Sequence, residues 1–164
     1  MGLENAARIA GLEAELRELV FASFDTADAW RLGCLITERA LDEGAGVVID
    51  IRRPGLILFR TALAGTTPDN EHWVDGKAAA VLRLESSSAL LAAKFAELGI
   101  DPAAAGWLPA PQYTIAGGSV PVRVAGVGTV AAVTVSGLSS DDDHQLVVDA
   151  MRAYLRDAAS GADE

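Results

Sequence analysis

The chain has 164 residues, of which 51% are hydrophobic and 22% are charged, a composition typical of a folded globular protein. Its 13 basic and 23 acidic residues give a formal net charge of −10. This charge repels phosphate backbones and argues against nucleic acid as a partner. The length fits one domain, and a single cysteine, Cys34, excludes a metal site built on cysteines.

The first residues, MGLENAARIAGLEAEL, carry acids and contain no apolar run long enough for a signal peptide or a membrane span. Cys34 lies on a helical stripe, which predicts a buried thiol in a reducing compartment. We therefore expect a cytoplasmic protein with no membrane partner. With only two histidines, a protein-only zinc site would need carboxylates to complete it, and we expect no metal.

The first third of the chain predicts two helices and a hairpin. Apolar residues at three- and four-residue steps predict a helix over residues 3–19, and a capped helix follows over residues 26–43. The run 20–24 between them is ambiguous between extended chain and a helix end. Residues 47–61 contain two β-branched and apolar runs around a Pro-Gly turn, which predicts a β-hairpin.

The middle of the chain predicts two more helices. Thr67 is an expected N-cap, with a proline at the first helical position, and this helix runs to about Glu85. A further helix ends at Leu98 before a glycine. The Pro- and Ala-rich connection that follows, residues 101–112, is expected to be ordered by its tryptophan.

The last third predicts a second hairpin over residues 120–136 and a final helix. We expect that helix to begin at Ser140, with Asp143 as an acidic variant of the capping box. Two hairpins among helices predict an α+β layer structure with one mainly antiparallel sheet. The predicted organisation is an N-terminal helix (1–22), a single domain (23–157) and a flexible tail (158–164).

The helix after Thr67 places Lys77 on a core-facing stripe, where a buried ammonium is costly unless it is paired. Two interpretations stay open: a lysine that reaches solvent at the sheet edge, or one paired with a carboxylate or an anionic ligand. Trp73 lies on the same stripe, and we expect it in the core rather than as a stacking platform. His72 lies on another face, and we expect it to be exposed.

Paired glycines, Gly117 and Gly118, precede the second hairpin. They allow a positive φ and a close approach of the backbone to a ligand, although on their own they are explained somewhat better by a tight turn. The spacing fits neither a Rossmann nor a P-loop fingerprint.

The corner from Ser136 to His144 joins a strand to the last helix. Three aspartates occupy the first turn of that helix, so it is better suited to stabilising the helix or binding a cation than to holding phosphate. His144 has the chemistry of a proton-transfer group or of an axial ligand to haem iron. We expect instead a solvated histidine.

Three blocks together resemble a known family: GTTPDNEHWVDGK (65–77), GGSVPVRVAGVGTVAAVTVSGL (117–138) and DDDHQLVV (141–148). They are similar to the UPF0303 group, a branch of the haem-degrading-domain superfamily that includes GlcG-like, HbpS-like and PduO C-terminal-like proteins. The resemblance covers roughly residues 24–155. It implies a profilin-like α/β sandwich, with an antiparallel sheet flanked by helices, that assembles into dimers and larger rings.

The resemblance also implies a ligand site near the helix of Lys77, the paired glycines and the corner of Ser136–His144. Some relatives bind haem or are associated with cobalamin metabolism, but the family transfers no catalytic residues. The candidate ligand-binding residues are Asn70, Trp73, Lys77, Gly117, Gly118, Ser136, Asp143 and His144.

The leading hypothesis is an oligomeric small-molecule-binding protein, with haem or another tetrapyrrole as the ligand and a second copy of the chain as the partner. The alternatives are a non-catalytic oligomeric scaffold and an enzyme that uses Lys77 or His144 for acid-base work on a small metabolite.

Overall fold

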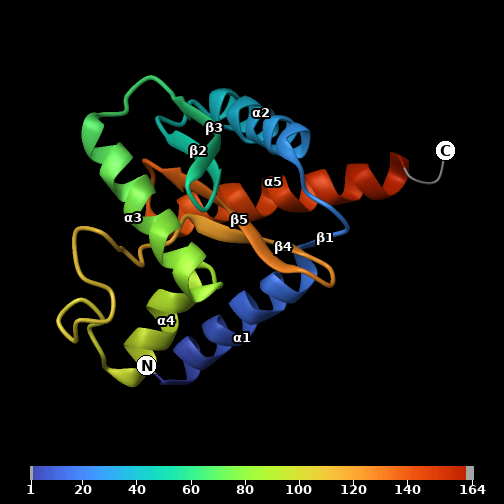
Figure 1. Ribbon diagram of the computed structural model, residues 1–164. Helices are drawn as coiled ribbons and strands as arrows, with labels where there is room; N and C mark the ends of the chain where they lie inside the picture. Colours follow the sequence, from blue (N-terminus) through green and yellow to red (C-terminus); the bar gives the residue numbers. More distant parts are fainter. Residues whose placement is uncertain (1, 162–164) are drawn as a thin grey trace.

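The computed structural model describes residues 2–161, which form five helices and five strands (Figure 1). In chain order the elements are α1 (Gly2–Glu18), β1 (Val20–Phe21), α2 (Thr26–Asp42), β2 (Val48–Arg53), β3 (Leu56–Ala62), α3 (Pro68–Leu84), α4 (Ser88–Leu98), β4 (Ser119–Val124), β5 (Gly128–Ser136) and α5 (Ser140–Gly161). The predicted α+β class is confirmed.

One five-stranded sheet has the order β1-β4-β5-β2-β3. Both predicted hairpins are present, β2–β3 and β4–β5, and they join side by side through antiparallel pairing of β5 with β2. The ambiguous run after the first helix supplies the short strand β1, which pairs with β4 in parallel. The sheet is therefore mixed but mainly antiparallel.

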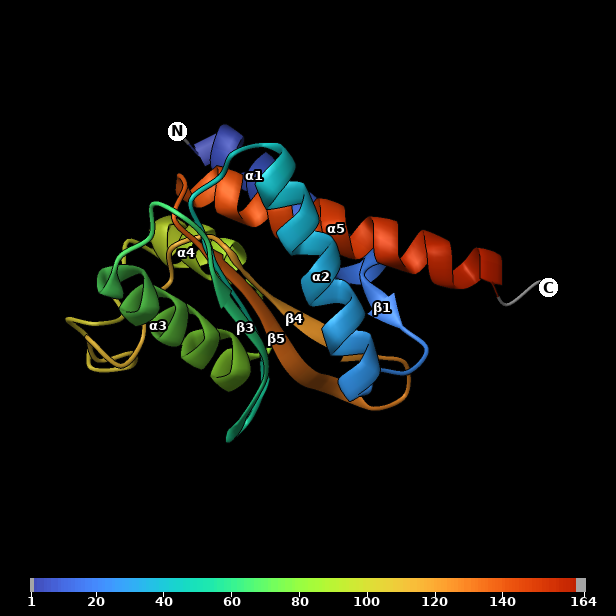
Figure 2. The ribbon, with the colours of Figure 1, turned by 90° about the horizontal axis from the view of Figure 1, so that it is seen from above.

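Helices cover both faces of the sheet. Figure 2 shows α3 on one side and α2 and α5 on the other. The main hydrophobic core lies between the sheet and the α2–α5 layer, and α1 and α4 also contribute to it. Beneath α3 the apolar contact is smaller and is built from Ala78, Val81 and Ala132. The α3 face of the sheet is consequently where polar side chains are buried.

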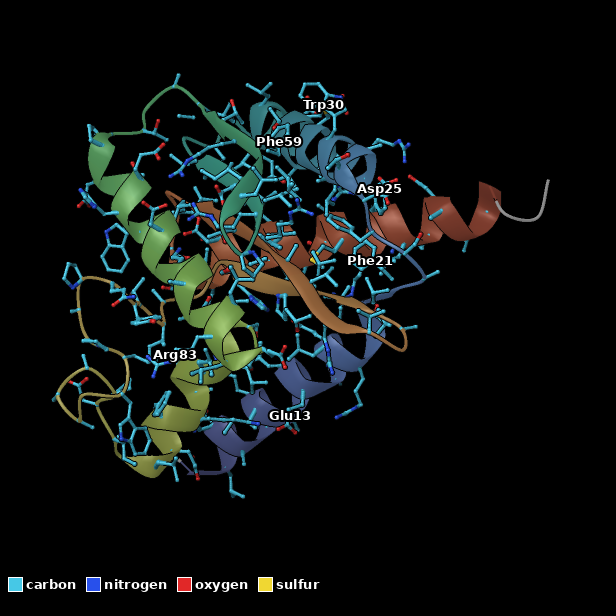
Figure 3. The ribbon with its side chains drawn as sticks, viewed as in Figure 1. Glu13, Phe21, Asp25, Trp30, Phe59 and Arg83 are labelled. Atoms are coloured by element: carbon cyan, nitrogen blue, oxygen red, sulfur yellow. The ribbon has the colours of Figure 1, made fainter. Side chains whose placement is uncertain are left out.

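A glycine in α2 sets how closely this helix packs on β3. The ring of Phe59 fills the space that a Cβ at Gly33 would occupy. Trp30, one turn earlier, packs edge-to-face on Phe59 with ring centroids 5.7 Å apart (Figure 3). Trp30 nevertheless stays largely exposed.

Helix α1 packs as part of the same body, and Leu12, Leu16 and Leu19 enter the main core. The domain boundary expected after residue 22 stays a prediction. At the other end α5 continues to Gly161, so residues 158–161 are helical, and the rest of the expected flexible tail lies outside the described residues. No helix within residues 2–161 is long and apolar enough to cross a lipid bilayer.

The start of α5 differs from the predicted capping box by one residue. Ser139 Oγ accepts the backbone N–H of Asp142 at 3.2 Å and donates to the Asp142 carboxylate at 2.7 Å. Asp143 has no part in this cap, because its side chain points inward. The acidic turn therefore contains one capping carboxylate and one buried carboxylate.

Candidate functional site

Lys77 and Asp143 form a buried ion pair between α3 and α5. Each residue is only 2% exposed, and Lys77 Nζ lies 3.0 Å from Asp143 Oδ2. The ammonium also donates to the carbonyl of Val135 at 3.1 Å. Asp143 accepts the backbone N–H of Leu138 at 2.9 Å and that of Gly137 at 3.4 Å. Of the two interpretations left open for Lys77, the structure shows the paired lysine.

Burial lowers the pKa of Lys77, and the Coulombic attraction and hydrogen bond of Asp143 oppose that shift. A buried pair of this kind costs desolvation free energy to form. Replacing only one partner by a neutral residue lowers the free energy of unfolding strongly, because the other charge is then left uncompensated in the interior. The pair ties α3 to the start of α5.

The paired glycines let this corner close. A Cβ at Gly118, where φ is 125°, would lie 2.5 Å from the carbonyl oxygen of Val135 and 2.9 Å from Asp143 Cβ. At Gly117 a Cβ would collide with the carbonyl of Ser140. The close backbone approach expected from the sequence is therefore made to the protein's own β5 and α5.

Ser136 completes this group of residues. It is buried, and it lies between Val135, which accepts from Lys77, and Gly137, which donates to Asp143. We call these residues the closed corner: Lys77, Gly117, Gly118, Ser136 and Asp143.

A row of polar residues crosses the sheet beneath α3, and it was not predicted from the sequence. Arg60, Asp50, Thr134 and Ser119 are register partners on successive strands. Ser119 Oγ and Thr134 Oγ1 lie 2.8 Å apart. Polar residues at alternate positions of otherwise apolar strands are the signal that would have revealed the row.

The row ends in an arginine–carboxylate cluster. Arg52 binds Asp50 through two hydrogen bonds of 2.6 and 3.0 Å, and it also donates to Asp75 at 2.7 Å. Arg60 lies 3.6 Å from Asp50 and also pairs with Glu71. Burial raises the pKa of Asp50 despite the two arginines. The cluster pairs two guanidinium groups with three carboxylates and joins α3 to the sheet, and the buried Nε of Arg60 has no hydrogen-bond partner among the described residues.

The prediction that His144 is a solvated histidine is wrong. The residue is 7% exposed, and its Nε2 lies 2.8 Å from Glu15 Oε2 of α1. Its Nδ1 is buried and has no hydrogen-bond partner among the described residues. Helix α1 covers this side of α5, which the sequence pattern of α5 alone does not reveal.

Trp73 does not lie in the core as expected. It is 43% exposed, and its Nε1 donates to Asp69 Oδ2 at 3.1 Å. The physical reason is the chain that packs beside it: Thr114 N donates to the carbonyl of Gly76 at 3.1 Å, and a Cβ at Gly76 would press on Thr114. This turn of α3 therefore faces the connection to β4 instead of the sheet.

Between α3 and the connection lies an open cleft of about 280 Å³. We call it the aromatic cleft, and its lining residues are Asp69, His72, Trp73, Ala110, Pro111, Tyr113 and Thr114. His72 is exposed, as predicted. Arg83 (labelled in Figure 3) places its guanidinium carbon over the Tyr113 ring, 5.0 Å from the ring centroid, and donates to the carbonyl of Trp107 at 2.8 Å.

The predicted site residues thus separate into groups. Five form the closed corner, and Trp73 lines the aromatic cleft together with His72, which the candidate set omitted. Asn70 caps α3, because its Oδ1 accepts the N–H of Thr67 at 2.8 Å. His144 lies against α1. A role for any of them in ligand binding stays a prediction.

Comparison with known sequences places the chain among named relatives. A family model described as "Haem degrading protein HbpS-like" matches residues 24–152. A UPF0303 protein of Streptomyces coelicolor is 45% identical over 150 residues, which covers 92% of this chain and 95% of that protein. A UPF0303 protein of Burkholderia mallei is 39% identical over 153 residues, with 93% of both chains covered.

Solved structures show the same fold. The crystal structure of the Ybr137w protein has a TM-score of 0.85 at 27% identity, covering 92% of this chain and 89% of that one. The crystal structure of the PduOC:Heme complex gives a TM-score of 0.69 at 17% identity over 80% of this chain and 94% of that one. HbpS gives 0.66 at 23% identity, over 82% and 92% of the two chains. The chain therefore belongs to the HbpS-like family, among its UPF0303 members.

Proposed function

We propose that the protein binds haem, or another tetrapyrrole, in the aromatic cleft with His72 as the axial ligand. One observation carries the proposal: of the two histidines, His72 is exposed and lines a cleft, whereas the Nε2 of His144 is held by Glu15 inside the protein. Haem iron is commonly held by a neutral imidazole nitrogen.

The other residues of the cleft fit a flat apolar ligand. Trp73, Tyr113 and Pro111 offer apolar faces, and aromatic rings favour stacked or edge-to-face contact. The volume of about 280 Å³ is at the small end for ligand pockets, so one edge of a macrocycle would enter and the rest would stay in solvent. Asp69 lines the same cleft, which favours a pose with the propionates turned away from its carboxylate.

The relatives support this ligand class. The matching family model carries the words "haem degrading", and PduOC, which shares the fold, was crystallised as a haem complex. Iron in a bound haem would supply redox chemistry. The protein's own residues would hold the ring and set access to it.

The test is a titration of the purified protein with haemin, followed by absorbance in the Soret region. We expect a saturable Soret shift at one haemin per chain. His72→Ala should abolish the shift. His144→Gln should retain it, because a glutamine amide at that position can still reach Glu15 while His72 is untouched.

No spectral change at stoichiometric haemin would refute the proposal. A shift that survives in His72→Ala but disappears in His144→Gln would move the site to the α1–α5 contact. Circular dichroism of both variants would show that the comparison is made on folded protein.

We also propose that the chain self-associates, as its family resemblance implies. Strand β3 is an edge of the sheet, and its Leu56 and Ile57 are 46% and 47% exposed. Exposed apolar residues on an unpaired edge favour association. Native mass spectrometry should show a multimer for the wild type and a smaller species for Ile57→Lys, and a monomeric wild type would contradict this proposal.

The scaffold alternative is supported by the same edge, and an oligomer that binds no haemin would favour it. The enzyme alternative has weaker support. Lys77 is buried and its pKa is lowered, but the ammonium is engaged by Asp143 and Val135 instead of facing a cleft. The cytoplasmic location stays a prediction.

A further inference from the structure

We propose a second ligand site, for a small phosphate monoester, at the C-terminal end of β4, whereas the closed corner lies at its N-terminal end. An open cleft of about 430 Å³ lies there, and we call it the arginine cleft. It is lined by Arg17 from the end of α1, Val20 of β1 and residues 123–128, which run from the end of β4 through the turn to the start of β5. The proposal does not depend on haem binding.

Neither arginine of this cleft, Arg17 or Arg123, forms an ion pair within 4.0 Å among the described residues, in a chain with a formal charge of −10. Elsewhere five arginines form ion pairs: Arg8, Arg31, Arg52, Arg60 and Arg152. The acid one turn before Arg17 is Glu13, which is bound by Lys94, with Nζ 2.7 Å from Oε1, so that Arg17 adds only the smallest contribution to the lowered pKa of Glu13. Two guanidinium groups that make no ion pair among the described residues therefore line one cavity.

The chemistry of the lining selects the ligand class. Guanidinium groups match the oxygens of phosphate through paired hydrogen bonds, and two positive charges suit a dianion. Gly126 and Gly128 have positive φ values of 74° and 107°, and a Cβ at either would meet nothing within 4 Å. A ligand can thus approach the backbone of this turn closely.

The apolar part of the ligand has a place beside the charges. Val20 and Val127 line the cleft and are exposed to solvent. A short alkyl group on the phosphate would cover them, whereas inorganic phosphate would not. The site should therefore prefer an alkyl phosphate over inorganic phosphate.

The test uses the full chain and follows backbone amide resonances by NMR during titration with butyl phosphate and, separately, inorganic phosphate. We expect saturable shifts at Gly126, Val127 and Gly128, with butyl phosphate binding severalfold more tightly. Arg17→Gln and Arg123→Gln should each weaken butyl phosphate binding about tenfold. Arg39→Gln is the matched control, because Arg39 makes no ion pair in the described structure and does not line the cleft.

Three results would overturn the site: no saturable shift at these amides, binding unchanged in both cleft variants, or an equal loss in Arg39→Gln. The last would show a response to net charge only. Equal affinity for butyl phosphate and inorganic phosphate would overturn the assigned role of Val20 and Val127.

Discussion

The closed corner and the aromatic cleft lie one helical turn apart on α3, yet they differ in almost every physical respect. Lys77 is 2% exposed and its charge is satisfied by Asp143, whereas Trp73 is 43% exposed and lines open space. The difference comes from what packs on each turn: the sheet and α5 cover Lys77, and a connection packs beside Trp73. A charged or aromatic residue at an unusual position in the sequence thus indicates a ligand site only where no other residue of the protein already pairs with it or covers it.

Breaking the ion pair should have the largest effect. In Lys77→Met the carboxylate of Asp143 is left buried without a cation, and we expect the free energy of unfolding to fall by about 3–5 kcal/mol. Urea denaturation followed by circular dichroism measures this. The double variant Lys77→Met/Asp143→Asn should recover part of the loss, since no buried charge remains uncompensated.

If the free energy of unfolding of Lys77→Met lies within about 1 kcal/mol of the wild-type value, water reaches the closed corner and the ion pair is not buried. A double variant no more stable than the single one would show that lost packing, and not an unpaired charge, sets the cost.

Gly118→Ala should have the next largest effect. Its Cβ would be forced to within 2.5 Å of a backbone oxygen at a positive φ, and we expect a loss of about 2 kcal/mol or more. Gly44→Ala is the control, because φ there is also positive, at 65°, but a Cβ meets nothing within 4 Å. If the two variants lose equal stability, backbone strain alone explains the glycine and the crowding adds nothing.

In the aromatic cleft, Trp73→Ala should lower the affinity for haemin more than it lowers the free energy of unfolding. The ring is half exposed, so we expect the free energy of unfolding to fall by less than about 1 kcal/mol. Haemin affinity should fall about tenfold, because tryptophan is enriched among the few residues that carry most of the binding energy of a contact surface. Trp30→Ala removes another exposed tryptophan, on α2, and should leave haemin binding unchanged; equal losses in the two variants would contradict the assigned cleft.

The elements of the fold followed well from the sequence because they depend on local signals. Periodicity, caps and turn residues located both hairpins and, apart from the end of α5, the helices to within a residue or two. The parallel pairing of Val20–Phe21 with β4 joins segments about a hundred residues apart, and no local signal encodes it.

The candidate site was harder to predict because it depends on tertiary contacts. Lys77 was recognised as anomalous, but its partner Asp143 was assigned to a helix cap, since a cap and a buried carboxylate have the same local sequence. For the same reason the sequence predicts an exposed His144 and a buried Trp73, whereas the structure shows the reverse. Whether α1 or a connection covers a helix face cannot be read from that helix alone.

The smallest expected effect concerns the one carboxylate that lines the aromatic cleft. Asp69→Asn keeps an oxygen for Trp73 Nε1 but removes a negative charge that repels the propionates of haem. We expect haemin affinity to rise about twofold, because the interaction is screened by solvent. Stability should fall slightly, because Asp69 lies in the first turn of α3 and complements the helix dipole.

Glu38→Gln makes the same change in net charge on α2 and should leave affinity unaltered. Opposite signs for affinity and stability in one variant would distinguish a charge that faces the ligand from one that only supports the helix, and a fall in both would show that Asp69 contributes to the cleft through Trp73 alone.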